Sequence, residues 1–86
     1  MSRFKIDENL PKLKNRLFLL INEKEIRENR RITYAQISEA TGIGMSVLSR
    51  WSQNQVDRFD SHVVVRLCEY FECDLSDLLY IDRSEN

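Results

Sequence analysis

The chain has 86 residues, of which 42% are hydrophobic and 31% charged, and its formal net charge is −1. These values fit one small folded domain and exclude a chain that is disordered throughout. Because there are only two glycines and one proline, and almost no alternating runs of Val, Ile or Thr, the composition favours helices over strands. We therefore expect an all-α domain.

Residues 1–9 are expected to form an N-terminal arm. Pro11 suits the first position of a helix, and leucines then recur at three- and four-residue spacings, at positions 10, 13, 17 and 20. This spacing predicts a helix from residue 10 to about residue 28. Its apolar run, residues 17–21, is far shorter than the roughly 20 residues that span a bilayer, so no membrane role is expected.

A polar connection with two adjacent arginines, Arg30 and Arg31, follows this helix. These arginines could be solvated or could meet a phosphate, and the pattern favours neither alternative. Thr33 and Gln36 then match a capping box, which predicts a second helix over residues 34–40. Gly42 is expected to end it, because glycine adopts positive φ without a Cβ clash.

Residues 44–53 form an amphipathic segment after this turn. On a helical wheel one face is apolar and contains Val47, Leu48 and Trp51. The opposite face carries short or flexible hydrogen-bonding side chains and one guanidinium, which are the groups that contact base edges in a major groove. Two short helices joined by a tight turn are typical of a helix-turn-helix unit.

The rest of the chain adds two helices. The polar stretch 52–55 leads into a loop carrying Arg58, and Asp60 or Ser61 can cap a helix whose apolar stripe includes Val64, Leu67, Cys68 and Phe71. Asp74 with Asp77 caps a last short helix containing Leu75, Leu78 and Leu79. With no linker or repeat visible, residues 10–81 are expected to be one domain, and residues 82–86 a tail.

Residues 32–81 resemble the helix-turn-helix domain of the phage Cro and repressor superfamily, which is also called XRE or lambda-repressor-like. The segments that carry the resemblance are Ile32-Thr33, Ile37-Ser38, Thr41-Gly42-Ile43, Leu48-Ser49-Arg50-Trp51, Val56-Asp57-Arg58-Phe59-Asp60 and Cys73-Asp74-Leu75-Ser76-Asp77-Leu78-Leu79. The resemblance implies a compact bundle of about five helices in which the second and third form the helix-turn-helix. The chain departs from the family pattern at Tyr34, Ser38, Gly44 and Met45, so individual base contacts are not transferred.

We hypothesise a sequence-specific DNA-binding transcriptional regulator, a repressor, that reads the major groove of double-stranded DNA with helix 44–53. The residues expected to face bases are Met45, Ser46, Ser49 and Arg50. The residues expected at phosphates are Thr33, Tyr34, Gly44, Gln53, Asn54, Gln55 and Arg58. One such module makes few base contacts, so a homodimer is expected. Its interface is expected at Leu79, Tyr80 and Ile81, which could instead seal the bundle against the first helix.

Charge is distributed unevenly along the chain. Residues 1–31 contain nine Lys or Arg against five Asp or Glu, whereas residues 60–86 contain two against seven. Such a protein can present a basic side to DNA and keep its acidic side in water. The acidic end and Met45 also suit an alternative, an antitoxin or protein-interaction module that retains the fold and binds a protein partner.

An enzyme is not expected, because the only imidazole is His62 and no nucleophile with a base and an orienting group is apparent. Cys68 and Cys73 lack the further ligands of a zinc site and are expected to be small core residues. Their free thiols suit a reducing cytoplasm, which is the expected location. No metal, cofactor or small-molecule ligand is expected.

Overall fold

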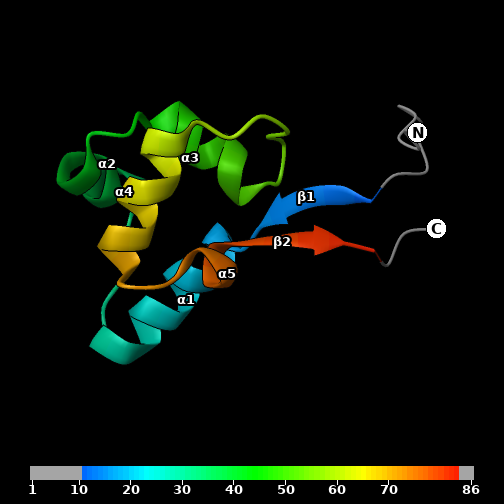
Figure 1. The fold of residues 1–86 in the computed structure, drawn as a ribbon. Coiled ribbons are helices and arrows are strands. Elements are labelled where there is room, and N and C mark those ends of the chain that lie inside the picture. Colours follow the sequence, from blue (N-terminus) through cyan, green and yellow to red (C-terminus); the bar gives the residue numbers. More distant parts are fainter. Residues whose placement is uncertain (1–10, 84–86) are drawn as a thin grey trace, which may run out of the picture.

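The computed structural model describes residues 11–83, which form five helices and two short strands (Figure 1). In chain order these are β1 (Lys12–Asn15), α1 (Leu17–Glu28), α2 (Tyr34–Thr41), α3 (Met45–Ser52), α4 (Ser61–Phe71), α5 (Leu75–Leu78) and β2 (Leu79–Asp82). The arm predicted for residues 1–9, and residues 84–86 of the predicted tail, lie outside the described residues.

Figure 1 shows α2, α3 and α4 gathered at one end of the molecule, with α1 and α5 beneath them. The strands β1 and β2 pair antiparallel and form a ribbon that projects to one side. Leu13 lies opposite Ile81 in this ribbon, and Asn15 lies opposite Leu79. The ribbon therefore joins the first described element of the chain to the last one.

The ribbon corrects three expectations. The domain is mostly helical rather than all-α, and its first helix begins at Leu17 instead of residue 10, with Pro11 preceding a strand. Leu79 likewise belongs to β2 and not to the last helix. The reason lies in tertiary structure. The leucine spacing from residue 10 fits a helix locally, but residues 12–15 pair with a segment from the other end of the described chain. Such a pairing can override local preference.

A single apolar core lies between the helices. Its buried residues are Leu17, Ile21, Ile32, Ile37, Ile43, Leu48, Trp51, Leu67, Phe71 and Leu78. Within it, Trp51 packs edge-on against the half-buried Phe59, with ring centroids 5.1 Å apart. Every helix contributes to this core, so each short helix is stabilised by burying its apolar face rather than by its own hydrogen bonds.

The N-cap of α4 follows the sequence expectation. The Asp60 carboxylate accepts a hydrogen bond from the His62 N–H at 2.8 Å. At the other end Glu72 adopts a left-handed conformation, and the Cys73 N–H donates to the Cys68 carbonyl at 3.0 Å. This bonding pattern is a Schellman motif, which brings the side chains at its two ends together.

The two thiols at that motif are free, half-buried and packed against the core. Burial raises the pKa of both thiols, and that of Cys73 reaches about 11. Within residues 11–83, no three His, Cys, Asp or Glu side chains converge as metal ligands would. Nor does that part of the chain contain a helix with the length and apolar character needed to cross a bilayer.

Candidate nucleic-acid interface

The turn between α2 and α3 is built by its own hydrogen bonds. Gly42 has φ of 82°, and its N–H donates to the Ser38 carbonyl at 2.7 Å. The Thr41 hydroxyl donates to the Ile37 carbonyl at 2.7 Å and accepts from the Ile43 N–H at 3.1 Å. Because Ile43 is buried in the core, the turn fixes how α3 leaves α2, as the position of Gly42 predicted.

The start of α2 carries the predicted capping box. The Thr33 hydroxyl accepts from the Gln36 N–H at 3.1 Å, while the Thr33 N–H donates to the Gln36 side-chain oxygen at 3.0 Å. The first turn contains no acidic residue. The N–H groups of Tyr34 and Ala35 have no partner within the helix, since the first turn of an α-helix leaves such donors free.

The two faces of α3 differ as the helical wheel predicts. Leu48 and Trp51 are buried, and Val47 is packed against the core. Met45, Ser46 and Arg50 are exposed on the opposite face, and Ser49 is half-buried. The four residues expected at bases therefore come from the side of α3 that does not pack.

Arg50 is the only cation on α3. Its guanidinium makes no hydrogen bond, ion pair or ring contact with any residue of the described part of the chain, and α3 itself contains no carboxylate. At the N-terminal end of α3, Gly44 is exposed, and a Cβ built there would meet no atom within 4 Å. This end of the helix is open to a ligand.

Tyr34 links the two helices. Its hydroxyl is hydrogen-bonded to the hydroxyl of Ser52, the last residue of α3. The Ser52 hydroxyl donates its own proton to the Ser49 carbonyl at 3.0 Å, so Tyr34 must be the donor in the pair. The phenol proton of Tyr34 is thus used inside the protein, and its backbone N–H is the donor left for an external group.

Asn15 is a buried structural position beside this interface that the sequence analysis missed. It is 4% exposed, and its side-chain amide donates to the Trp51 carbonyl at 3.0 Å and to the Asn54 side-chain oxygen at 3.2 Å. Its own side-chain oxygen accepts from the Leu17 N–H at 2.9 Å. This one residue therefore ties the end of α3 to β1 and to the start of α1.

The polar residues after α3 occupy different environments. The Gln53 amide donates to the Ser49 hydroxyl at 3.2 Å. The side-chain oxygen of Asn54 accepts from the Asn15 N–H at 2.8 Å, with Asn54 in a left-handed conformation, φ 55°. Gln55 and Arg58 are exposed, and their side chains have no partner among residues 11–83. Of these four residues, Gln55 and Arg58 are therefore the ones whose side chains are free to turn toward a ligand.

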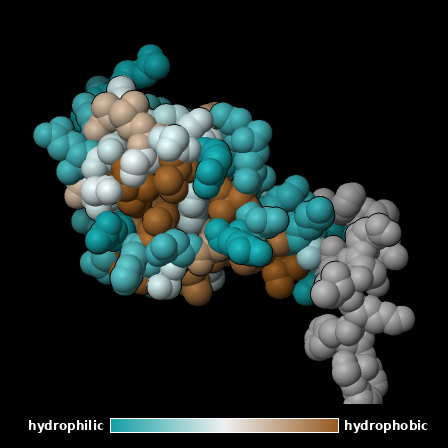
Figure 2. Space-filling view, turned by 90° about the horizontal axis from the view of Figure 1, so that it is seen from above, coloured by the Kyte–Doolittle hydropathy of each residue, from teal (hydrophilic) through white to brown (hydrophobic). Residues whose placement is uncertain are grey.

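The residues expected at a dimer interface lie in the ribbon. Ile81 is 52% exposed and faces Leu13, which is 42% exposed, whereas Leu79 and Tyr80 are half-buried. Seen from above, hydrophobic atoms appear where the ribbon leaves the body, among hydrophilic ones (Figure 2). Charged side chains lie in and beside the ribbon: Lys14 pairs with Asp82 at 3.0 Å, and Arg16, which follows β1, stacks on the Tyr80 ring at 4.2 Å.

Comparisons with known proteins agree with this geometry. The family profile of the Cro/C1-type helix-turn-helix DNA-binding domain matches residues 24–83. Among curated proteins, none matches the chain.

Two solved structures share the fold. A candidate DNA-binding protein from Bacteroides fragilis superposes with a TM-score of 0.62 at 24% identity, over 79% of this chain and 98% of that one. The transcriptional regulator VanUg superposes with a TM-score of 0.60 at 18% identity, over 92% of this chain and 96% of that one.

Proposed function

This chain belongs to the family of Cro/C1-type helix-turn-helix DNA-binding domains, and from that membership we propose that it is a transcriptional regulator, acting as a repressor. In this proposal α3 enters the major groove of double-stranded DNA. Met45, Ser46, Ser49 and Arg50 then face bases, and Arg50 is the main determinant of sequence preference because a guanidinium can bond guanine bidentately.

The observation that carries the proposal is Arg50, which has no partner among residues 11–83 and lies on the exposed face of a helix whose opposite face is buried through Leu48 and Trp51. Because one face of α3 is fixed in the core, its opposite face has a defined direction. The side chains proposed to enter the groove therefore project from a fixed backbone. Gly44 at the start of α3 leaves room for the DNA backbone to approach.

Phosphate contacts are proposed on both sides of the groove. At the start of α2 they come from the Thr33 hydroxyl proton and the Tyr34 N–H, where the helix dipole favours an anion. Beyond α3 they come from the exposed residues that follow it, namely Gln53, Asn54, Gln55 and Arg58. For Asn54 the contact uses its side-chain NH2, because its oxygen is bonded to Asn15.

Selection of bound duplexes from a random DNA pool tests the proposal. We expect a preferred half-site of a few base pairs, repeated as a palindrome. Recovery of unrelated sequences, with no enrichment over the starting pool, would contradict sequence-specific binding.

A homodimer is part of the proposal, because one module makes few base contacts. Its interface is proposed at Leu79, Tyr80 and Ile81, and the exposed Ile81 beside Leu13 supports this position. Light scattering during size exclusion should give twice the monomer mass, and Ile81→Lys should lower it. Val65→Lys is the matched control, since Val65 is 57% exposed on α4. A monomer at high concentration would remove the dimer from the proposal.

A protein partner, as in an antitoxin, is the second candidate function. The observation that favours it is an apolar stripe on α1, where Phe18, Leu19 and Ile26 are 61%, 47% and 80% exposed. Exposed apolar stripes of this kind often mark protein contacts. Absence of binding to random duplex DNA at low salt would favour this candidate over the first.

A further inference from the structure

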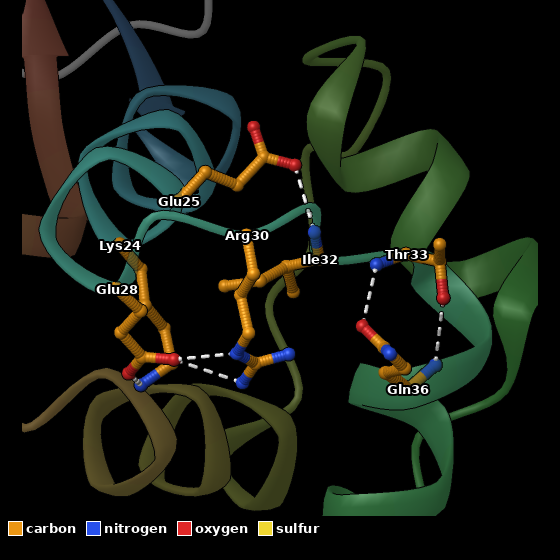
Figure 3. A network of polar contacts seen from close by, with 7 residues as sticks. All are labelled: Lys24, Glu25, Glu28, Arg30, Ile32, Thr33 and Gln36. Atoms are coloured by element: carbon orange, nitrogen blue, oxygen red, sulfur yellow. Dashed lines mark hydrogen bonds and ion pairs between the residues drawn. The ribbon is translucent and has the colours of Figure 1, made fainter.

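The segment that connects α1 to α2 is fixed at several points (Figure 3). The Arg30 guanidinium contacts the Glu28 carboxylate through two nitrogens, at 2.9 and 2.8 Å. The Ile32 N–H donates to the Glu25 carboxylate at 2.8 Å, and the Ile32 side chain is buried in the core. The Thr33 N–H is bonded within the capping box of α2. This short segment therefore has a defined backbone path.

The two adjacent arginines differ in this arrangement. Glu28 takes up the charge of Arg30 and also contacts the Lys24 ammonium at 2.8 Å. Contacts with Lys24 first, and then with Arg30, lower the pKa of Glu28. Arg31 is exposed and has no hydrogen bond, ion pair or ring contact within residues 11–83.

Arg31 is also close to the start of α2. It precedes Tyr34 by three residues, which limits their Cα separation to about 10 Å. Tyr34 in turn contacts Ser52 at the end of α3, so this helix start lies beside the proposed DNA-reading helix. A long cationic side chain here can share an oxyanion with the free N–H groups of α2.

We propose that Arg31 binds a phosphodiester of the duplex DNA backbone beside the start of α2, whereas Arg30 serves to fix the connecting segment. This inference rests on the proposed DNA-binding function. It divides two neighbouring residues of the same type into a ligand-binding one and a structural one.

The matched variants Arg31→Gln and Arg30→Gln test the division, because each removes one positive charge from the same short segment. Affinity for a fluorescein-labelled duplex is measured by anisotropy between 50 and 200 mM KCl, at a temperature where circular dichroism shows both variants folded. Each phosphate contact releases counterions and contributes about 0.9 to the slope of log affinity against log salt concentration. At 0.1 M salt, losing one such contact therefore weakens binding about eight-fold.

Arg31→Gln should therefore weaken binding about eight-fold at 0.1 M KCl and reduce the salt slope by about 0.9. Arg30→Gln should change affinity by less than about two-fold, and Arg31→Lys should restore most of the loss, since the charge is kept. Equal effects of the two Gln variants, large or small, would overturn the inference while leaving DNA binding intact. A wild-type protein that binds no duplex would instead overturn the proposed function, and this inference with it.

Discussion

The Tyr34 hydroxyl at the first residue of α2 donates a hydrogen bond to the Ser52 hydroxyl at the last residue of α3. The start of one helix is thereby joined to the end of the next, while Gly42 and Thr41 join their other ends through the turn. The relative orientation of the two helices is therefore set at both ends.

Tyr34→Phe removes the hydroxyl from this pair and should lower the free energy of unfolding by about 0.5–1.5 kcal/mol, the net value of one hydrogen bond. Urea denaturation measures the change. A double-mutant cycle with Ser52→Ala should give a coupling of similar size, because each substitution removes the same contact. Additive effects in that cycle would show that the pair does not stabilise the fold.

Arg50→Ala should remove about 1–3 kcal/mol of discrimination between a selected site and a site with one changed guanine. Arg58→Ala should weaken binding to both sites equally and lower the salt slope by about 1, as loss of a phosphate contact does. Gel-shift titration of each variant on the two duplexes separates these outcomes. If Arg50→Ala leaves affinity and preference unchanged, α3 does not bind as proposed.

Gly44→Asp should separate stability from DNA binding. Gly44 is the N-cap of α3, and its Cβ position is open, so Asp and Asn should each raise stability by a few tenths of a kcal/mol. Only Asp adds a negative charge, which costs about 1 kcal/mol beside a phosphate in water, or about five-fold in affinity. Anisotropy titrations of Gly44→Asp against Gly44→Asn check this, and equal affinities would mean that no phosphate approaches Gly44.

Asn15→Ala should lower the free energy of unfolding by about 2–3 kcal/mol, because it leaves the buried Leu17 N–H and Trp51 carbonyl without this partner. Lys12→Ala, an exposed position on the same strand, is the control and should change stability by less than about 0.5 kcal/mol. Urea denaturation compares them. If both variants lose similar stability, the hydrogen bonds of Asn15 between β1 and α3 do not stabilise the fold as proposed.

Cys73 makes stability depend on alkaline pH. Its thiol has a folded-state pKa of about 11 against an ordinary value of 9.0, so the folded protein holds this proton more tightly than the unfolded chain. The resulting stabilisation is complete below pH 9 and is lost as the pH rises toward 11. Urea denaturation between pH 8 and 11 under reducing conditions should show the decline. In Cys73→Ala the loss of stability between pH 8 and 11 should be smaller. A loss equal to that of the wild-type protein would show that other groups cause it.

The α2–α3 unit could be predicted because its signals are local. The Thr33 and Gln36 pair, the position of Gly42, and the spacing of Leu48 and Trp51 each depend on a few neighbouring residues. The exposure of Met45, Ser46 and Arg50 followed from the same wheel. Their roles at bases remain predictions.

The ribbon could not be predicted in this way, since its pairing joins Leu13 to Ile81 across the whole domain. Asn15 offered one signal, because Asn is a preferred residue just before a helix, yet the leucine spacing outweighed it. The different environments of Arg30 and Arg31 were equally hidden, because they depend on where Glu28 points its carboxylate.

The pairing of Lys12 with Asp82 places the two strand ends side by side at the outer end of the ribbon. Pro11 and Arg83, the first and last described residues, therefore lie near each other at the end of the ribbon that points away from the helices (Figure 1). A fluorescent protein or affinity tag could be fused before Pro11 or after Arg83 without crowding α3. Joining Arg83 to Pro11 with a short linker, and reopening the chain elsewhere, should likewise yield a circular permutant with the same architecture.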